Sequence, residues 1–163
     1  MNIILEGPDN SGKTYLAKQL AEYFNLEYTH SGGPPKNVLL HCRAQNIKLS
    51  EGNKILDRCT PISEHVYGKN LSNFEFYLQD FSRKAIFIYC RPSIEHLLDK
   101  RNQSLSEHDN EETAAYTNED YARFIAKYDE IFKTVPHIFY NWTIEHTQQE
   151  SIYDRIIESS MAE

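Results

Sequence analysis

The sequence predicts an α/β fold: a doubly wound, parallel sheet of five strands with helices between them. Two observations lead to it. Short apolar runs alternate along the chain with longer segments of helical periodicity, the order typical of a parallel sheet with crossover helices. A glycine-rich loop also stands between the first apolar run and the first helical segment. The 163 residues suffice for one domain, so we expect residues 1–163 to form a single unit.

The first strand is expected at 2–6, where Ile, Ile and Leu follow one another. The first helix begins near Lys13 and has apolar side chains every three or four residues. A second strand at 27–30 ends at the Gly-Gly-Pro-Pro cluster of residues 32–35, which marks a turn. A single helix, about 36–48, then fits before the third strand.

The third strand is expected at 54–57, and a short helical turn at 62–67 follows it. Ser72 and Glu75 have the spacing of a capping box, which predicts that the next helix begins there. The apolar run at 85–90 suits a central strand.

The last third of the chain contains helices, a polar segment and one more strand. A helix starts at Pro92-Ser93, and the polar residues 102–116 are expected to be irregular and mobile. A helix with regularly spaced aromatic residues covers 118–133. The final elements are a strand at 137–141 and a helix at 148–159.

Residues 7–14 match the pattern G-x-x-x-x-G-K-[ST] at every fixed position. In a strand-loop-helix context this is a phosphate-binding loop, whose backbone N–H groups and following helix N-terminus hold a phosphate chain. Lys13 should reach the β- and γ-phosphates, and the Thr14 hydroxyl should ligate Mg²⁺. The loop predicts a P-loop NTPase that uses ATP and Mg²⁺. Its predicted nucleotide-binding residues are Gly7, Asp9, Asn10, Ser11, Gly12, Lys13 and Thr14.

The third strand ends in Asp57-Arg58. An acidic residue at the tip of a neighbouring apolar strand is the Walker-B arrangement, so Asp57 is a second candidate for holding Mg²⁺. Arg58 offers a fork of donors to a phosphate. We therefore expect Lys13, Asp57 and Arg58 to act together in phosphoryl transfer.

Two stretches resemble the thymidylate kinase family. Residues 5–14, LEGPDNSGKT, resemble its loop signature. Residues 57–68, DRCTPISEHVYG, resemble its D-R-x-x-x-S-x-x-A-Y motif, although Cys59 and Val66 depart from the usual residues. The aromatic helix from residue 120 to 128 also looks like the helix that follows the lid in that family.

The resemblance implies a nucleoside monophosphate kinase that phosphorylates a deoxynucleoside monophosphate, such as dTMP, to the diphosphate. It implies that Asp9 lies near the acceptor, that Arg58 binds the acceptor phosphate, and that Ser63 and Tyr67 shape the acceptor pocket. Only one helix fits between the second and third strands, where thymidylate kinases carry more. The base preference is therefore open, and the resemblance extends to compact phage-type deoxynucleotide kinases, which are similar in size. Arg43, in that helix, is the candidate for a base or phosphate contact.

Charge develops on the transferred group during phosphoryl transfer, and a cation lowers that barrier. The polar segment near 100–116 is the natural lid. It lacks an arginine of its own after its first residues, so the closing cation should come from Arg91, Lys100 or Arg101. Arg91 is the preferred candidate because it follows the fourth strand.

Composition narrows the class of partner. The net charge of −7 disfavours a nucleic-acid partner, and three scattered cysteines fit neither a disulfide framework nor a zinc site. No basic-then-apolar leader and no membrane-length apolar run is visible, so we expect a cytoplasmic protein without a membrane partner. A homodimer stays open.

Three alternatives remain. A kinase for a deoxynucleoside or another small-molecule hydroxyl needs a general base, often a carboxylate after the second strand, where this chain has His30-Ser31-Gly32-Gly33. A polynucleotide 5′-kinase is disfavoured by the acidic charge. A non-catalytic nucleotide switch would read guanine with an N-K-x-D segment, and the nearest string, at 53–57, has the wrong spacing.

Overall fold

The computed structural model describes residues 1–30, 35–68, 72–107 and 116–162. Its five strands form one parallel sheet in the order β2-β3-β1-β4-β5, which confirms the predicted fold class. The strands are β1 (Ile3–Glu6), β2 (Glu27–His30), β3 (Lys54–Asp57), β4 (Ile86–Cys90) and β5 (Ile138–Tyr140). The central strand, β1, pairs Ile3 with Ile55 on one side and with Ile86 on the other.

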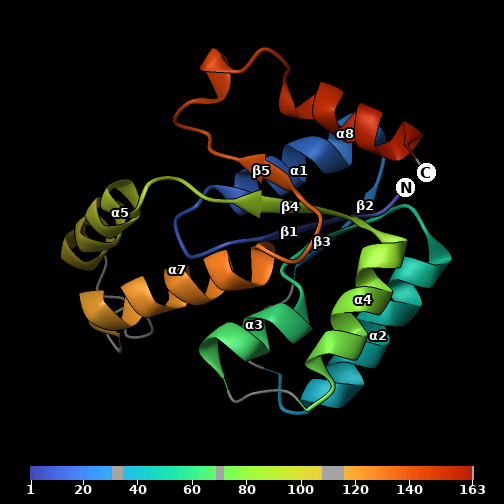
Figure 1. Ribbon diagram of the computed structural model, residues 1–163, viewed down its shortest axis with the longest axis horizontal. Helices are drawn as coiled ribbons and strands as arrows, with labels where there is room; N and C mark the ends of the chain where they lie inside the picture. The colour runs from blue at the N-terminus through green and yellow to red at the C-terminus, as the bar shows by residue number, and fades with distance from the viewer. Residues whose placement is uncertain (31–34, 69–71, 108–115, 163) are drawn as a thin grey trace.

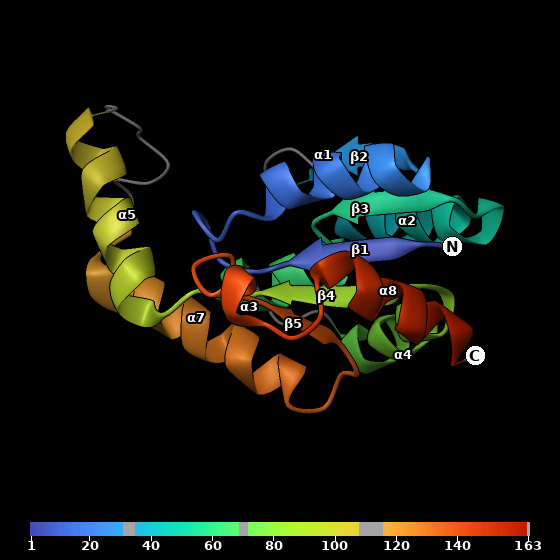
Figure 2. The same ribbon diagram turned by 90° about the horizontal axis from the view of Figure 1, so that it is seen from above.

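Helices cover both faces of the sheet (Figures 1 and 2). The helical elements are α1 (Lys13–Phe24), α2 (Val38–Glu51), α3 (Thr60–Tyr67), α4 (Phe74–Lys84), α5 (Ile94–Glu107), α7 (Asn118–Phe132), the 3-10 turn η1 (Glu145–Thr147) and α8 (Ile152–Met161). One face carries α1 and α8, and the other carries α2, α3, α4 and α7. In Figure 2, α5 extends beyond the end of the sheet at which β4 terminates.

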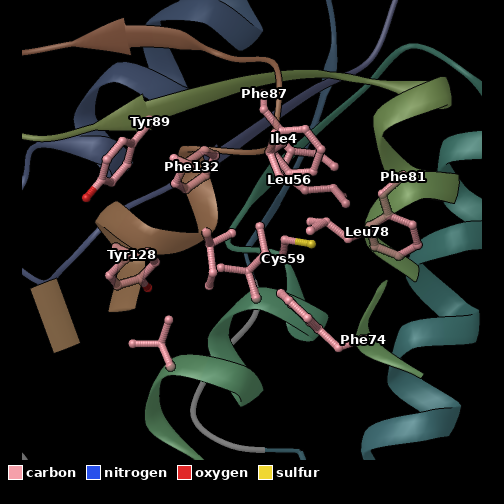
Figure 3. Close-up of a cluster of buried hydrophobic side chains, with 14 of the residues drawn as sticks. Ile4, Leu56, Cys59, Phe74, Leu78, Phe81, Phe87, Tyr89, Tyr128 and Phe132 are labelled. Carbon is pink, nitrogen blue, oxygen red and sulfur yellow. The ribbon is translucent and has the colours of Figure 1, made fainter. Parts of the chain in front are cut away.

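The core has two layers because the central strands β1, β3 and β4 are buried on both faces. Ile3 and Leu5 of β1 pack in the layer under α1 and α8, and Ile4, between them, packs in the opposite layer. In Figure 3, Ile4 lies with Phe81 of α4 and Phe132 of α7 in that second layer. A continuous apolar run is therefore what a strand in this position needs.

The structure corrects two expectations about helix ends. The helix predicted to start at Ser72 with a capping box begins at Phe74, with Asn73 as its N-cap and no side-chain cap. The segment expected to be irregular from residue 102 is helical as far as Glu107, the end of α5. The rest of that polar segment, 108–115, lies outside the described residues, as do 31–34 of the predicted glycine-proline turn.

Helix α7 begins with a capping box that the sequence analysis did not predict. The Thr117 hydroxyl accepts the Asp120 N–H at 3.1 Å, and the Asp120 carboxylate accepts the Thr117 N–H at 3.0 Å. Two backbone N–H groups at the start of α7, those of Thr117 and Asp120, are thus satisfied. None of the helices in the described part of the chain has the length and hydropathy of a membrane span.

Candidate functional site

The loop after β1 requires glycine at two positions. Gly7 has φ 153°, and a Cβ there would lie 2.3 Å from the Cys90 carbonyl oxygen of β4. Gly12 has φ 84° and is the N-cap of α1, with no side-chain cap hydrogen bond. The first N–H groups of α1 are therefore left for a ligand, as an anion site needs. Trp142, the single tryptophan of the chain, packs against Gly12.

Lys13 lies folded over this loop. Its ammonium donates to the Pro8 carbonyl at 3.2 Å and is buried. Burial lowers the pKa of Lys13, and the nearby charge of Arg58 lowers it further. The hydroxyl of Ser11 is also buried and has no hydrogen-bond partner among the residues that the structure describes. A buried donor without a partner is costly, so the loop is built to hold a group that it can bind.

Asp57, at the end of β3, is fully buried, and three side chains contact one of its carboxylate oxygens. Its Oδ2 accepts from the Thr14 hydroxyl at 2.7 Å and the Tyr28 hydroxyl at 2.9 Å, and lies 3.1 Å from His30 Nδ1. Burial opposes the charge of Asp57, but the hydrogen bonds from Thr14 and Tyr28 outweigh it, so its pKa lies below the usual range.

The donor set around Asp57 fits a hard cation. Its Oδ1 is buried and has no hydrogen-bond partner within the described part of the chain, and the Thr14 hydroxyl lies beside the other oxygen. Carboxylate and hydroxyl oxygens are the ligands that Mg²⁺ prefers. Thr14 and Asp57, the two predicted metal ligands, are therefore brought together by the fold.

Arg58 is held between the loop and helix α3. Its guanidinium donates to the Asp9 carboxylate and lies 5.8 Å from the ring centre of Tyr67. Burial disfavours its charge, but the electrostatic effects of Tyr128, Glu6 and Asp9 more than offset burial, so the pKa of Arg58 is raised. Its φ of 84° is left-handed, a conformation that costs a non-glycine residue about 1–3 kcal/mol.

The other predicted acceptor residues occupy different environments. The Ser63 hydroxyl donates to the Glu6 carboxylate at 2.9 Å. The Tyr67 ring is half-buried and packs 4.7 Å from Phe124 of α7, between centroids. Arg43 is exposed on α2 and makes no hydrogen bond or ion pair with another described residue. The structure thus places Tyr67 beside Arg58, bonds Ser63 to Glu6, and gives Arg43 no partner among the described residues.

The predicted lid cations are mostly engaged elsewhere. Arg91 donates to both carboxylate oxygens of Asp129 on α7, each at 3.0 Å, and the hydrogen bond that it donates to Asp129 raises the pKa of Arg91. Arg101 is buried and donates to the Tyr116 carbonyl and the Asn118 side chain, while Lys100 is exposed. Arg91 as a catalytic cation stays a prediction, and in this structure its guanidinium belongs to the α7 ion pair.

Sequence reasoning missed several residues of this site. Glu6 is a fully buried carboxylate that no site prediction included. Its signal was present, because it is the one charged residue in the first apolar run. Tyr28 and His30, two apart on β2, had the spacing that puts both on one face of a strand. The Tyr121 hydroxyl donates to the Asp9 carbonyl. These residues are 112 positions apart, so no local sequence pattern could predict their contact.

Comparison with known proteins finds relatives for part of the sequence. No protein-family model matches the chain. It is 34% identical over 65 residues to a cytidylate kinase of Clostridium acetobutylicum, a match that covers 40% of this chain and 30% of that protein. A cytidylate kinase of Mesomycoplasma hyopneumoniae is 28% identical over 61 residues, 37% of this chain and 27% of that protein. The matched segments span less than a third of the length of these curated relatives.

Solved structures are similar over the whole chain. YorR from Bacillus subtilis, in complex with phosphorylated GDP, aligns with a TM-score of 0.68 at 20% identity and covers 99% of this chain and 96% of its own. Deoxyadenosine kinase from M. mycoides, with dCMP and dCDP, gives 0.61 at 16%, with both chains covered completely. Shikimate kinase from Acinetobacter baumannii gives 0.58 at 16% over 99% and 93%. The chain therefore has the P-loop fold of the nucleoside and nucleotide kinases.

Proposed function

We propose that this protein transfers the terminal phosphoryl group of ATP, with Mg²⁺, to a deoxynucleoside monophosphate and forms the diphosphate. The observation that carries this proposal is the strand tip of β3. There Asp57 reaches Thr14 of the donor loop at 2.7 Å, while the next residue, Arg58, presents a cation beside the loop residue Asp9. Two consecutive residues, Asp57 and Arg58, would thus contact the phosphate donor and the anionic acceptor, respectively.

Each residue has a role that its position supports. The loop N–H groups and Lys13 bind the donor phosphates, and Thr14 with Asp57 would hold Mg²⁺, which when bound neutralises phosphate charge. Arg58 anchors the acceptor phosphate after exchanging its ion pair with Asp9 for one with the substrate. Catalysis then rests on proximity and on fixed charges, with no covalent intermediate.

A monophosphate acceptor agrees with the end of β2. That strand terminates in His30, and the sequence that follows, Ser-Gly-Gly-Pro, contains no carboxylate. A phosphate acceptor is already anionic and needs no general base to attack. The cytidylate kinases matched over part of the chain support a nucleotide acceptor and add cytosine to the bases that need testing.

The second candidate is transfer to a hydroxyl of a deoxynucleoside or another small molecule. His30 favours it, because its ring nitrogen lies 3.1 Å from Asp57 while its side chain is 49% exposed. A histidine oriented by a carboxylate is an arrangement that can accept a hydroxyl proton. A deoxyadenosine kinase and a shikimate kinase share the fold, so the fold itself accommodates hydroxyl acceptors.

An acceptor panel separates the two candidates. The protein is incubated with ATP and Mg²⁺ and with dTMP, dCMP, dAMP, dGMP or CMP, or with the matching nucleosides, and both ADP and the phosphorylated product are measured. We expect diphosphate product with at least one monophosphate and none from the nucleosides. Monophosphate product from a nucleoside would establish the hydroxyl candidate instead. Slow ADP release that is independent of any acceptor would refute both.

Two variants test the assigned roles. Lys13→Met should abolish transfer while the circular dichroism spectrum is kept. Arg58→Ala should raise the KM of the monophosphate about 100-fold, as expected for losing about 3 kcal/mol of charge-assisted hydrogen bonding. It should change the KM of ATP much less. Equal increases for both substrates would contradict the assignment of Arg58 to the acceptor.

A further inference from the structure

The turn that carries Arg58 is held in an unfavourable conformation. Arg58 has a left-handed φ of 84°, although only glycine adopts that region readily. The helix that follows, α3, has Cys59 as its N-cap and no side-chain cap of its own. Such a conformation persists only where the surroundings impose it.

Gln45, a buried residue of α2, holds this turn from one side. Its Oε1 accepts the Thr60 N–H at 2.9 Å, and its Nε2 donates to the Arg58 carbonyl at 3.3 Å. One amide group thus binds the backbone on both sides of Cys59. His41, one helical turn earlier, contacts the Thr60 hydroxyl at 2.5 Å, so the same face of α2 reaches this turn twice.

Glu6, at the end of β1, holds the turn from the other side. Its carboxylate accepts the Cys59 N–H at 3.0 Å and the Ser63 hydroxyl at 2.9 Å. It also accepts the N–H of Gly7 at 3.3 Å and the Tyr128 hydroxyl at 3.1 Å. The turn is therefore capped by side chains from two other elements, and one of them is continuous with the donor loop.

We propose that Gln45 and Glu6 are positioning residues for Arg58: they fix its left-handed backbone and thereby aim its guanidinium at the acceptor phosphate. This inference rests on the proposed monophosphate acceptor. The hydrogen bonds from Gln45 to the Arg58 carbonyl and from the Thr60 N–H to Gln45 both involve the backbone of the turn. The effect of Gln45 on the acceptor would pass through that backbone.

The test uses Gln45→Met, which keeps the length of the side chain and removes its hydrogen bonds with the Thr60 N–H and the Arg58 carbonyl. We expect the KM of the monophosphate to rise roughly tenfold, within the range of couplings between neighbouring residues, and the KM of ATP to stay within about twofold. In the Arg58→Ala background, the same change should have little further effect on the acceptor.

Asn2 provides the matched control. It is also a buried amide that binds backbone, donating to Leu49 at 2.7 Å and to Lys84 at 3.0 Å, but it lies at the opposite end of β1. Asn2→Leu should lower the melting temperature without changing the KM of the monophosphate. If Gln45→Met behaves like Asn2→Leu, or raises the acceptor KM equally with and without Arg58, the inference is wrong.

A second measurement does not depend on turnover. Hydrogen exchange at the Thr60 amide should become faster in Gln45→Met than in the wild type. An unchanged exchange rate at this amide would refute the claim that Gln45 holds the turn. If the wild type phosphorylates no monophosphate at all, the proposed function fails on the acceptor panel. The exchange result then still decides separately whether Gln45 holds the turn.

Discussion

Arg58 offers a direct measure of the strain stored in the candidate acceptor site. Two substitutions, Arg58→Ala and Arg58→Gly, remove the same guanidinium and the same ion pair with Asp9. They differ in the backbone. Alanine must still adopt the φ of 84°, whereas glycine reaches it without a steric penalty. The difference in stability between the two variants therefore isolates the conformation.

The expected magnitude follows from two opposing terms. A left-handed non-glycine residue costs about 1–2 kcal/mol, which glycine avoids. Glycine in turn loses about 0.4–1 kcal/mol because it makes the unfolded chain more flexible. Arg58→Gly should thus unfold with a free energy about 0.5–1 kcal/mol larger than that of Arg58→Ala. For a domain of this size, the melting temperatures should differ by roughly 1–4 °C.

Urea and thermal unfolding of both variants, followed by circular dichroism, measure this difference. The monophosphate affinity of both variants should fall alike, because neither retains the cation. If the alanine variant is as stable as the glycine variant or more so, the conformation at position 58 is not strained. Gln45 and Glu6 would then have no strained conformation to hold at Arg58.

Three further predictions concern the loop and the strand tip. Trp142, 43% exposed and packed against Gly12, should change its fluorescence when ATP binds, and an unchanged emission spectrum at saturating nucleotide would place the nucleotide elsewhere. Gly7→Ala should destabilise the fold, since its Cβ would lie 2.3 Å from the Cys90 carbonyl, and a wild-type melting temperature would contradict that geometry. Asp57→Asn should be less stable than the wild type at neutral pH, and the gap should close in acid. The folded pKa of Asp57 is depressed, so its ionised form contributes stability above the unfolded pKa of about 3.9, and that contribution is lost as the pH falls through the lower folded pKa. A gap in melting temperature that stays constant from pH 7 to pH 3 would count against the hydrogen-bonded carboxylate.

Local patterns in the sequence predicted the elements well where one physical cause dominates. The run Ile3-Ile4-Leu5 predicts a strand because a central parallel strand is buried on both faces. The aromatic spacing over 118–133 predicts α7, which ends one residue earlier at Phe132. Helix starts were less predictable: a capping spacing at Ser72 forms no cap, while the one at Thr117 does. A capping hydrogen bond forms only if the preceding residues hold the N-cap side chain near the first N–H groups of the helix. The spacing of residue types along the sequence does not determine that geometry.

The sequence alone determined the loop, its lysine and threonine, and the acidic tip of β3, because their chemistry requires fixed residue types at fixed spacing. Only the tertiary structure decided how these parts are supported. Glu6, Gln45 and Tyr128 come from three elements and meet around one turn. Likewise Arg91 is drawn into an ion pair with Asp129, 38 residues away. Such partners depend on the packing of distant elements. Hydrogen bonds between distant elements produce no periodic pattern in the sequence from which they could be predicted.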